Sequence, residues 1–176
     1  NDTTTCISLA ASGTETGNNY SDNPSITPDG RYIAFTSSAT NLISGGSTGG
    51  NYQVFVRDTI SNTTTLVSVN SSGIQANGDC QVSTISSDGR YIAFQSNATN
   101  LVEDDTNGTW DIFVRDLTAG TTTRVSTGPL SIQSNGGSFT PSMTSDGSAL
   151  VFQSQATNLI SGGTTGNQIF LRRLLP

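Results

Sequence analysis

The sequence lacks the residues on which most enzymes and nucleic-acid-binding proteins depend. Its 176 residues include no His and no Lys, all seven basic residues are Arg, and charged residues amount to 11%. Without His or Lys there is no Ser-His-Asp or Cys-His arrangement and no Schiff-base lysine. We therefore predict that the chain is not an enzyme and has no catalytic residue. The net charge of −6 argues against phosphate binding, so no nucleic-acid partner is expected.

Long apolar runs are missing as well. No segment approaches the roughly 20 apolar residues that span a bilayer, which predicts no membrane insertion. The polar surface must be built from Ser, Thr, Asn and Gly, and we predict an extracellular or cell-surface location. Six Asn-x-Ser/Thr sequons are candidate glycosylation sites, although a chain this rich in Asn, Ser and Thr also produces them by chance. They stand at Asn1, Asn19, Asn62, Asn70, Asn97 and Asn107.

What the sequence does contain is one unit, repeated three times. Residues 28–35 read Pro-Asp-Gly-Arg-Tyr-Ile-Ala-Phe, residues 87–94 match them closely, and residues 145–152 are a weaker third copy. The aspartates of the three blocks, at 29, 88 and 146, are 59 and 58 residues apart. Three further blocks keep the same order and period, which predicts a repeat architecture. These are Thr-Thr-Thr at 3–5, 63–65 and 121–123, Ala-Thr-Asn-Leu at 39–42, 98–101 and 156–159, and Phe-Val-Arg-Asp or its variant at 55–58, 113–116 and 170–173.

Each unit predicts four short antiparallel strands. In the first unit these lie around residues 24–27, 32–36, 53–57 and 63–69. The Asp-Gly dipeptide between the first two strands is a strong hairpin signal, because glycine accepts the positive φ that such a turn needs. No stretch shows helical periodicity, so the chain is predicted to be all-β.

The Pro-Asp-Gly-Arg-Tyr-Ile-Ala-Phe and Phe-Val-Arg-Asp blocks resemble the WD-like propeller repeats of TolB-type proteins. The resemblance covers essentially the whole chain, and it implies a β-propeller scaffold used for binding or assembly, with no shared catalytic residue. The third copy departs from the pattern, with Ser148 in place of Arg and Arg173 in place of Asp.

We predict a single propeller module over residues 1–176. It comprises a first strand at 1–9, blade one at 20–70, blade two at 79–128, and blade three at 138–176 without an outer strand. Propellers typically have four to eight blades. Three blades are therefore too few to close, and two chains would complete a six-bladed ring.

The predicted open edge of blade three is a template for a strand of another chain. We expect a second copy to donate that strand, in a heterologous contact that gives a ring if the rotation closes and a filament if it does not. The leading hypothesis is a self-assembling extracellular structural module, such as a filament, tube or surface coat. One alternative is a dimeric six-bladed propeller that binds glycans or proteins; another is a fragment of a longer propeller whose missing strand follows Pro176. The donated strand consists of Thr3, Thr4, Thr5, Cys6, Ile7, Ser8 and Leu9, and the acceptor edge of Ile169, Phe170, Leu171 and Arg172.

One acidic loop is a candidate calcium site, because hard cations prefer oxygen ligands. The matching loops at 44–48 and 161–165 contain no acidic residue, so a solvated acidic loop is the competing interpretation. No other cofactor is expected, since two cysteines without His do not make an ordinary zinc site. The candidate ligands are Asp104, Asp105, Asn107 and Asp111.

The remaining arginines and cysteines give two further predictions. The repeated Arg57, Arg115 and Arg172 are expected to have a structural role, such as pairing with the turn aspartates, whereas the unrepeated Arg124 is expected at the surface. Cys6 and Cys80 would lie about two blades apart in a ring, beyond the Cα separation of about 7 Å that a disulfide permits. A bond between them would therefore join two chains, and two unpaired buried thiols are the alternative.

Overall fold

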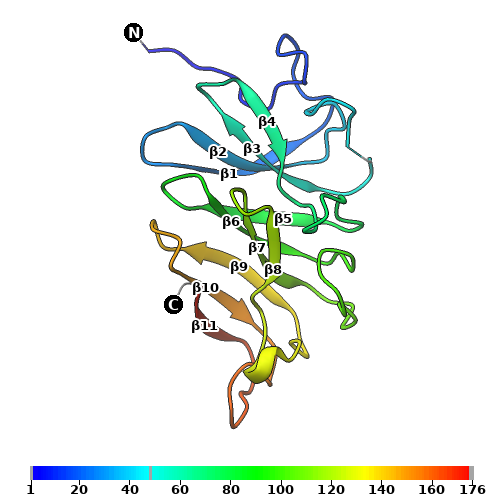
Figure 1. The fold of residues 1–176 in the computed structure, drawn as a ribbon, viewed down its shortest axis with the longest axis vertical. Coiled ribbons are helices and arrows are strands. Elements are labelled where there is room, and N and C mark those ends of the chain that lie inside the picture. The colour runs from blue at the N-terminus through cyan, green and yellow to red at the C-terminus, as the bar shows by residue number, and fades with distance from the viewer. Residues whose placement is uncertain (1, 48, 175–176) are drawn as a thin grey trace.

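The computed structural model describes residues 2–47 and 49–174, which form three antiparallel sheets that we call blades one, two and three (Figure 1). Blades one and two each have four strands, paired in sequence order, and blade three has three. Figure 1 shows the blades following one another along the long axis of the molecule in chain order. This arrangement confirms the predicted all-β fold and its interpretation as part of a β-propeller.

The strands have the following bounds. Blade one contains β1 (Ser21–Ile26), β2 (Tyr32–Ser37), β3 (Gln53–Asp58) and β4 (Thr63–Leu66). Blade two contains β5 (Cys80–Ile85), β6 (Tyr91–Ser96), β7 (Asp111–Asp116) and β8 (Thr121–Arg124). Blade three contains β9 (Ser138–Met143), β10 (Ala149–Ser154) and β11 (Gln168–Arg173). A single 3₁₀ turn, Pro129–Ser131, follows β8, and among the described residues no helix is long and apolar enough to cross a membrane.

The aspartate of each Asp-Gly turn holds the first two strands of its blade together. Asp29 Oδ1 accepts a hydrogen bond from the Thr27 hydroxyl at 2.6 Å and another from the Arg31 backbone N–H at 3.0 Å. The same pair of contacts recurs at Asp88 and Asp146. Because these donors favour the charged form, they lower the pKa of all three carboxyl groups, to about 2 at Asp146.

In blades one and two, a salt bridge joins the residue just before the second strand to the last residue of the third strand. Arg31 Nη2 lies 2.8 Å from Asp58 Oδ2, and Arg90 Nη2 lies 2.7 Å from Asp116 Oδ2. The hydrogen bonds from Arg90 lower the pKa of Asp116 to about 2. These pairs correct the prediction that the arginine of the Phe-Val-Arg-Asp block binds a turn aspartate, since it is the aspartate of that block that is paired.

Blade three lacks this salt bridge because both partners are replaced. Ser148 stands at the position of Arg31 and Arg90, and Arg173 stands at the position of the two aspartates. The two departures of the third repeat are therefore coupled changes at one contact.

The Ala-Thr-Asn-Leu block fastens each loop to the segment that leads into the blade. Asn41 Oδ1 accepts a hydrogen bond from the Asn18 backbone N–H at 2.9 Å, and Asn18 exchanges two further bonds with Thr40. Asn77 and Asn135 make the same contacts in the other two repeats. The block therefore has a structural role in all three copies.

The hydrophobic core lies between the blades. We call the face of a blade that packs on the next blade in the chain its outgoing face, and the face that receives the preceding blade its incoming face. Ala34, Val54 and Val56 on the outgoing face of blade one pack with Ile92 and Phe94 on the incoming face of blade two. The equivalent cluster between blades two and three includes Ala93, Ile112, Val114, Leu150 and Phe152. Since burying such a side chain contributes about 1.5–3 kcal/mol, each blade is stabilised by its neighbours.

Candidate assembly site

The outer strands of blades one and two show how a complete blade is closed. Arg57 lies opposite Thr64 in the β3–β4 pair and donates to its hydroxyl at 3.2 Å. Arg115 lies opposite Thr122 in the β7–β8 pair and donates to its hydroxyl at 3.1 Å. Arg115 also reaches the carbonyl of Asn70, in the loop that comes from blade one. In both complete blades, the arginine of the third strand therefore binds the central threonine of a Thr-Thr-Thr segment.

A serine four residues beyond that threonine closes the other end of the pairing. Ser68 accepts a hydrogen bond from the Val54 backbone N–H at 3.0 Å and donates to Gln53 Oε1 at 2.6 Å. Ser126 makes the same two contacts, with the Ile112 N–H and with Asp111. The outer strand therefore follows the pattern Thr-Thr-Thr-x-Val-Ser in both complete blades.

Blade three presents the same positions without an outer strand. β11 pairs with β10 along one edge, and its other edge pairs with no strand in the described part of the chain. The predicted acceptor residues lie in β11, from Ile169 to Arg172, and a cavity of about 550 Å³ borders Ile169, Phe170 and Leu171. A second cavity of about 350 Å³ lies beside β8, lined by Thr121, Thr123 and Val125 among others. The first cavity borders the strand beside which a fourth strand of blade three would lie.

The first part of the predicted donor segment is exposed and pairs with no strand of the described chain, whereas Ile7, Ser8 and Leu9 are half-buried. Among the described residues, 2–8 contain no strand, and Thr3, Thr4, Thr5 and Cys6 are solvent-exposed. Figure 1 shows this segment projecting from blade one, far from β11. The residues that follow it fold as they do after a true outer strand, because the bridge between Leu9 and Thr16 repeats those between Val69 and Gln75 and between Thr127 and Gln133.

The acidic loop before β7 forms an ion-pair network with Arg124. The Arg124 Nη1 lies 3.1 Å from Asp105 Oδ1 and 3.9 Å from Asp111 Oδ2, and the Arg124 side chain is 9% exposed. The prediction of a surface Arg124 is therefore wrong. Asn107 turns its amide NH₂ toward Asp111 at 2.8 Å, and Asp104 is exposed. An arginine and an amide donor thus occupy the carboxylates of Asp105 and Asp111, which argues against a calcium ion at these two groups.

A difference in charged residues between the first two repeats is the sequence signal that could have revealed this network. Asp111 stands where blade one has Gln53, and Arg124 stands where blade one has Leu66. Blade two therefore has one acidic and one basic residue at positions that are uncharged in blade one. Burial and the charge of Asp111 raise the pKa of Asp105, which outweighs the lowering by Arg124. The site is therefore a partly desolvated ion pair.

The two cysteines are both free and lie in different environments. Cys6 is exposed, whereas Cys80 is fully buried in β5, where its thiol donates to the Ser96 hydroxyl at 3.2 Å. Burial raises the pKa of the Cys80 thiol to about 12. The structure thus does not present Cys80 to a second chain, which argues against the inter-chain disulfide with Cys6.

The sequons differ in how accessible their asparagines are. Asn19, Asn62 and Asn97 are exposed, and Asn1 lies outside the described residues. The amide groups of Asn70 and Asn107 are half-buried and donate to the Asn100 carbonyl and to Asp111. Glycosylation stays a prediction, and the exposed sites are the better candidates.

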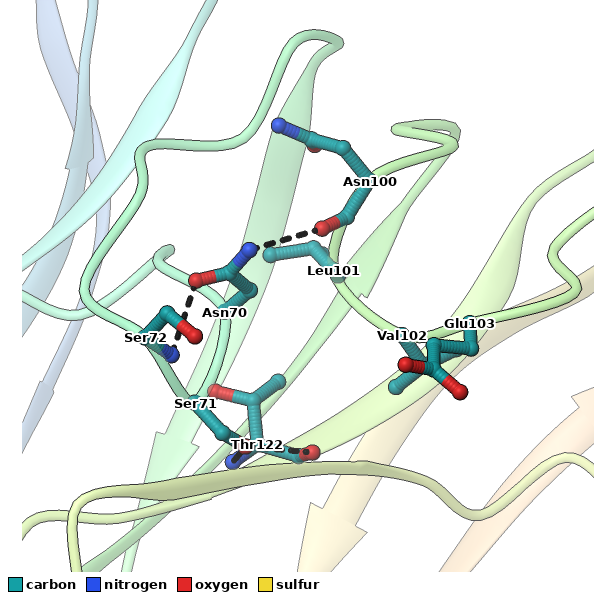
Figure 2. A pocket seen from close by; sticks show the side chains of 8 residues that line it. All are labelled: Asn70, Ser71, Ser72, Asn100, Leu101, Val102, Glu103 and Thr122. Atoms are coloured by element: carbon teal, nitrogen blue, oxygen red, sulfur yellow. Dashed lines mark hydrogen bonds between the residues drawn. The ribbon is translucent and has the colours of Figure 1, made fainter.

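A polar pocket of about 440 Å³ lies where the loop after β4 meets blade two (Figure 2). Asn70 donates to the Asn100 carbonyl at 3.3 Å and accepts from the Ser72 N–H at 2.9 Å, while Ser71 accepts from the Thr122 N–H at 3.0 Å. Figure 2 shows Glu103 at the opposite side of this pocket. Most polar groups that line the pocket therefore bond to one another.

Comparison with solved structures finds the same fold in other proteins. A putative TolB from Agrobacterium tumefaciens aligns over 92% of this chain and 48% of its own, with a TM-score of 0.55 and 17% identity. The tricorn protease aligns over 92% of this chain and 14% of its own, with a TM-score of 0.58 and 15% identity. An acylaminoacyl peptidase from Pyrococcus horikoshii aligns over 77% of this chain and 17% of its own, with a TM-score of 0.46 and 17% identity. No family model and no curated protein matches the sequence. The chain thus shares the propeller fold of TolB-type proteins and spans less than half the length of each of these three proteins.

The match to the tricorn protease contradicts the prediction that the chain is not an enzyme. The tricorn protease is an enzyme by name, and it has this fold in part of its chain. That prediction follows from the missing His and Lys and from a resemblance that implies no catalytic residue. A fold that occurs in enzymes gives no ground for excluding catalysis.

Proposed function

We propose that the chain is a self-assembling β-propeller module, in which residues 3–9 of one copy form the outer strand of blade three of the next. One observation carries the proposal. Arg57 and Arg115 each bind the central threonine of a Thr-Thr-Thr segment, and Arg172 occupies the same position with no such threonine beside it in the described part of the chain. Thr3–Thr5 is the copy of that segment that pairs with no strand.

The repeat fixes the register of the proposed pairing. Phe55 lies opposite Leu66 and Phe113 opposite Arg124, which places Cys6 opposite Phe170. Thr4 then lies opposite Arg172. Ser8 reaches Gln168, as Ser68 reaches Gln53.

The strand by itself would hold two copies together only weakly. The β3–β4 ladder contains four residue pairs, and at a net ~1 kcal/mol per hydrogen bond four bonds give about 4 kcal/mol. Association costs about 4–15 kcal/mol in lost freedom. A stable assembly therefore needs further contacts between copies.

The biological setting that we propose is extracellular. The surface is rich in uncharged Ser, Thr and Asn, and three sequon asparagines are exposed. A filament, tube or surface coat built from head-to-tail copies suits such a surface. The second candidate is a closed dimer of six blades that binds a glycan or protein, and the polar pocket between the loop after β4 and blade two is the observation that favours it.

A single proline tests the donated strand in the intact chain. The Val67 backbone N–H donates to the Val54 carbonyl in blade one, and Ile7 is the counterpart of Val67. Because every second N–H of a strand points to the same neighbour, Thr5 and Ile7 would direct their N–H groups to β11. Thr5→Pro removes such a donor, whereas the control Thr5→Ala keeps it. Both changes lie in an exposed segment and should leave the melting temperature of the monomer unchanged.

Sedimentation velocity and alkylation of Cys6 provide the readouts. We expect the wild-type chain and Thr5→Ala to form assemblies in which Cys6 is protected, and Thr5→Pro to stay monomeric with Cys6 reactive. Equal assembly of the two variants would refute strand donation, as would a wild-type chain that is monomeric at all concentrations.

A further inference from the structure

The outgoing face of blade three is apolar and exposed at positions that are buried in the other two blades. Val151, Ile169 and Leu171 are 38%, 70% and 60% exposed. Their counterparts in blades one and two are all 7% exposed or less. These counterparts are Ala34, Val54 and Val56 in blade one, and Ala93, Ile112 and Val114 in blade two.

The incoming face of blade one shows the complementary exposure. Ile26 is 61% exposed, whereas its counterpart Ile85 in blade two is 9% exposed. A cavity of about 200 Å³ on this face is lined by Pro24, Ile33 and Phe35 among others. At the equivalent positions of blade two, Ile92 and Phe94 are fully buried under blade one, whereas Ile33 is half-buried and Phe35 is 4% exposed.

We infer that these two faces are one interface, in which the outgoing face of blade three packs on the incoming face of blade one of a second copy. The inference rests on the proposed assembly and names the surface that supplies its missing contacts. The occupant is a second copy because the two blade junctions inside the chain pack the same positions in the same way.

Backbone hydrogen bonds indicate how the copies would be aligned. At the first internal junction the Cys80 N–H donates to the Tyr52 carbonyl at 2.8 Å, and at the second the Ser138 N–H donates to the Trp110 carbonyl at 2.7 Å. The equivalent pair between copies is the Ser21 N–H and the Asn167 carbonyl. The strand order agrees with this, because a strand donated by residues 3–9 leads directly into the blade that docks.

The side chains make this junction different from the internal ones. Tyr32 covers Gly89, where an added Cβ would lie 2.3 Å from its ring, and Tyr91 covers Gly147 in the same way. Blade three has Ala149 at the tyrosine position. The missing ring is offset by larger residues nearby, since Val151 and Leu171 replace an alanine and a valine. The junction between copies thus has its own shape, which disfavours docking of blade three onto an internal blade.

Two exposed positions test the interface in the full chain. We expect Ile26→Asp, on the incoming face, and Leu171→Asp, on the outgoing face, each to weaken self-association at least tenfold in sedimentation equilibrium. Ile60→Asp is the control, because Ile60 is 71% exposed in the turn between β3 and β4 and lies on neither face. All three variants should melt as the wild-type monomer does.

Mixing the two face variants tests the head-to-tail direction. Ile26→Asp keeps an intact blade three and Leu171→Asp keeps an intact blade one, so the mixture retains one native junction and should form a 1:1 complex that does not grow. A mixture that stays monomeric, or single variants that assemble as the control does, would overturn the interface. If assembly is lost in Thr5→Pro but kept in the two face variants, strand donation is supported and the interface is refuted. If assembly is kept in Thr5→Pro but lost in the two face variants, the interface is supported and strand donation is refuted.

Discussion

Removing the Arg124 side chain should destabilise the monomer, and the size of the loss tests the ion-pair network of blade two. The guanidinium neutralises Asp105 and the fully buried Asp111. Removing one partner of a buried ion pair leaves an uncompensated charge, which costs about 3–5 kcal/mol. Ser126 and Ser134 still donate to Asp111 at 2.5 and 2.8 Å, so we expect Arg124→Leu to lie near the lower limit, about 3 kcal/mol. For a domain of this size that corresponds to a fall in melting temperature of about 6–12 °C.

Blade one supplies the compensating change. It has Gln53 and Leu66 at the positions of Asp111 and Arg124, so the double variant Arg124→Leu, Asp111→Gln reproduces a pair that this fold already accepts. We expect the double variant to recover to within about 1–2 kcal/mol of the wild type. Asp104→Asn is the control, because Asp104 is exposed in the same loop.

Urea unfolding followed by the fluorescence of Trp110, the only tryptophan, measures these free energies. The cost of Arg124→Leu should also shrink as the pH is lowered from 7 toward the raised pKa of Asp105. Burial raises the pKa of Asp105 above its unfolded value, so its charged form destabilises the folded state at higher pH, and protonation relieves that cost. A loss below about 1 kcal/mol at pH 7, or a double variant no more stable than Arg124→Leu, would refute the reasoning.

Two further predictions concern blade packing and the thiols. Gly89→Ala should destabilise the monomer by at least 1 kcal/mol more than Gly30→Ala in thermal melts. Both glycines have positive φ, at 75° and 73°, but only at Gly89 would the added Cβ clash with the ring of Tyr32. Equal losses of stability in the two variants would count against the packing described. On the native monomer, iodoacetamide at pH 8 should label Cys6 and leave Cys80 unmodified until the chain unfolds, since Cys80 is buried and its pKa is about 12. Mass spectrometry that finds two labels on the native monomer would contradict this.

The repeat in the sequence determined the architecture. Asp-Gly turns, strands with two apolar faces and a period of 58 or 59 residues predicted blades in their order, because turn geometry and alternation are local properties of the chain. The proposed donor segment and acceptor edge follow from the same comparison between neighbouring repeats. The hydrogen bonds from Arg57 to Thr64 and from Arg115 to Thr122 explain why a threonine recurs at this position.

The tertiary structure decided what side chains do across the sheet. Sequence alone assigned Arg57 to the turn aspartates and Arg124 to the surface, because it does not show which face of a strand a charge occupies or which loop comes near it. The strand pairing placed Arg124 beside Asp105 and Asp111, and it placed Val151, Ile169 and Leu171 on a face that nothing in the described chain covers. Local pattern specifies a blade, whereas burial and charge pairing arise only when blades pack against one another.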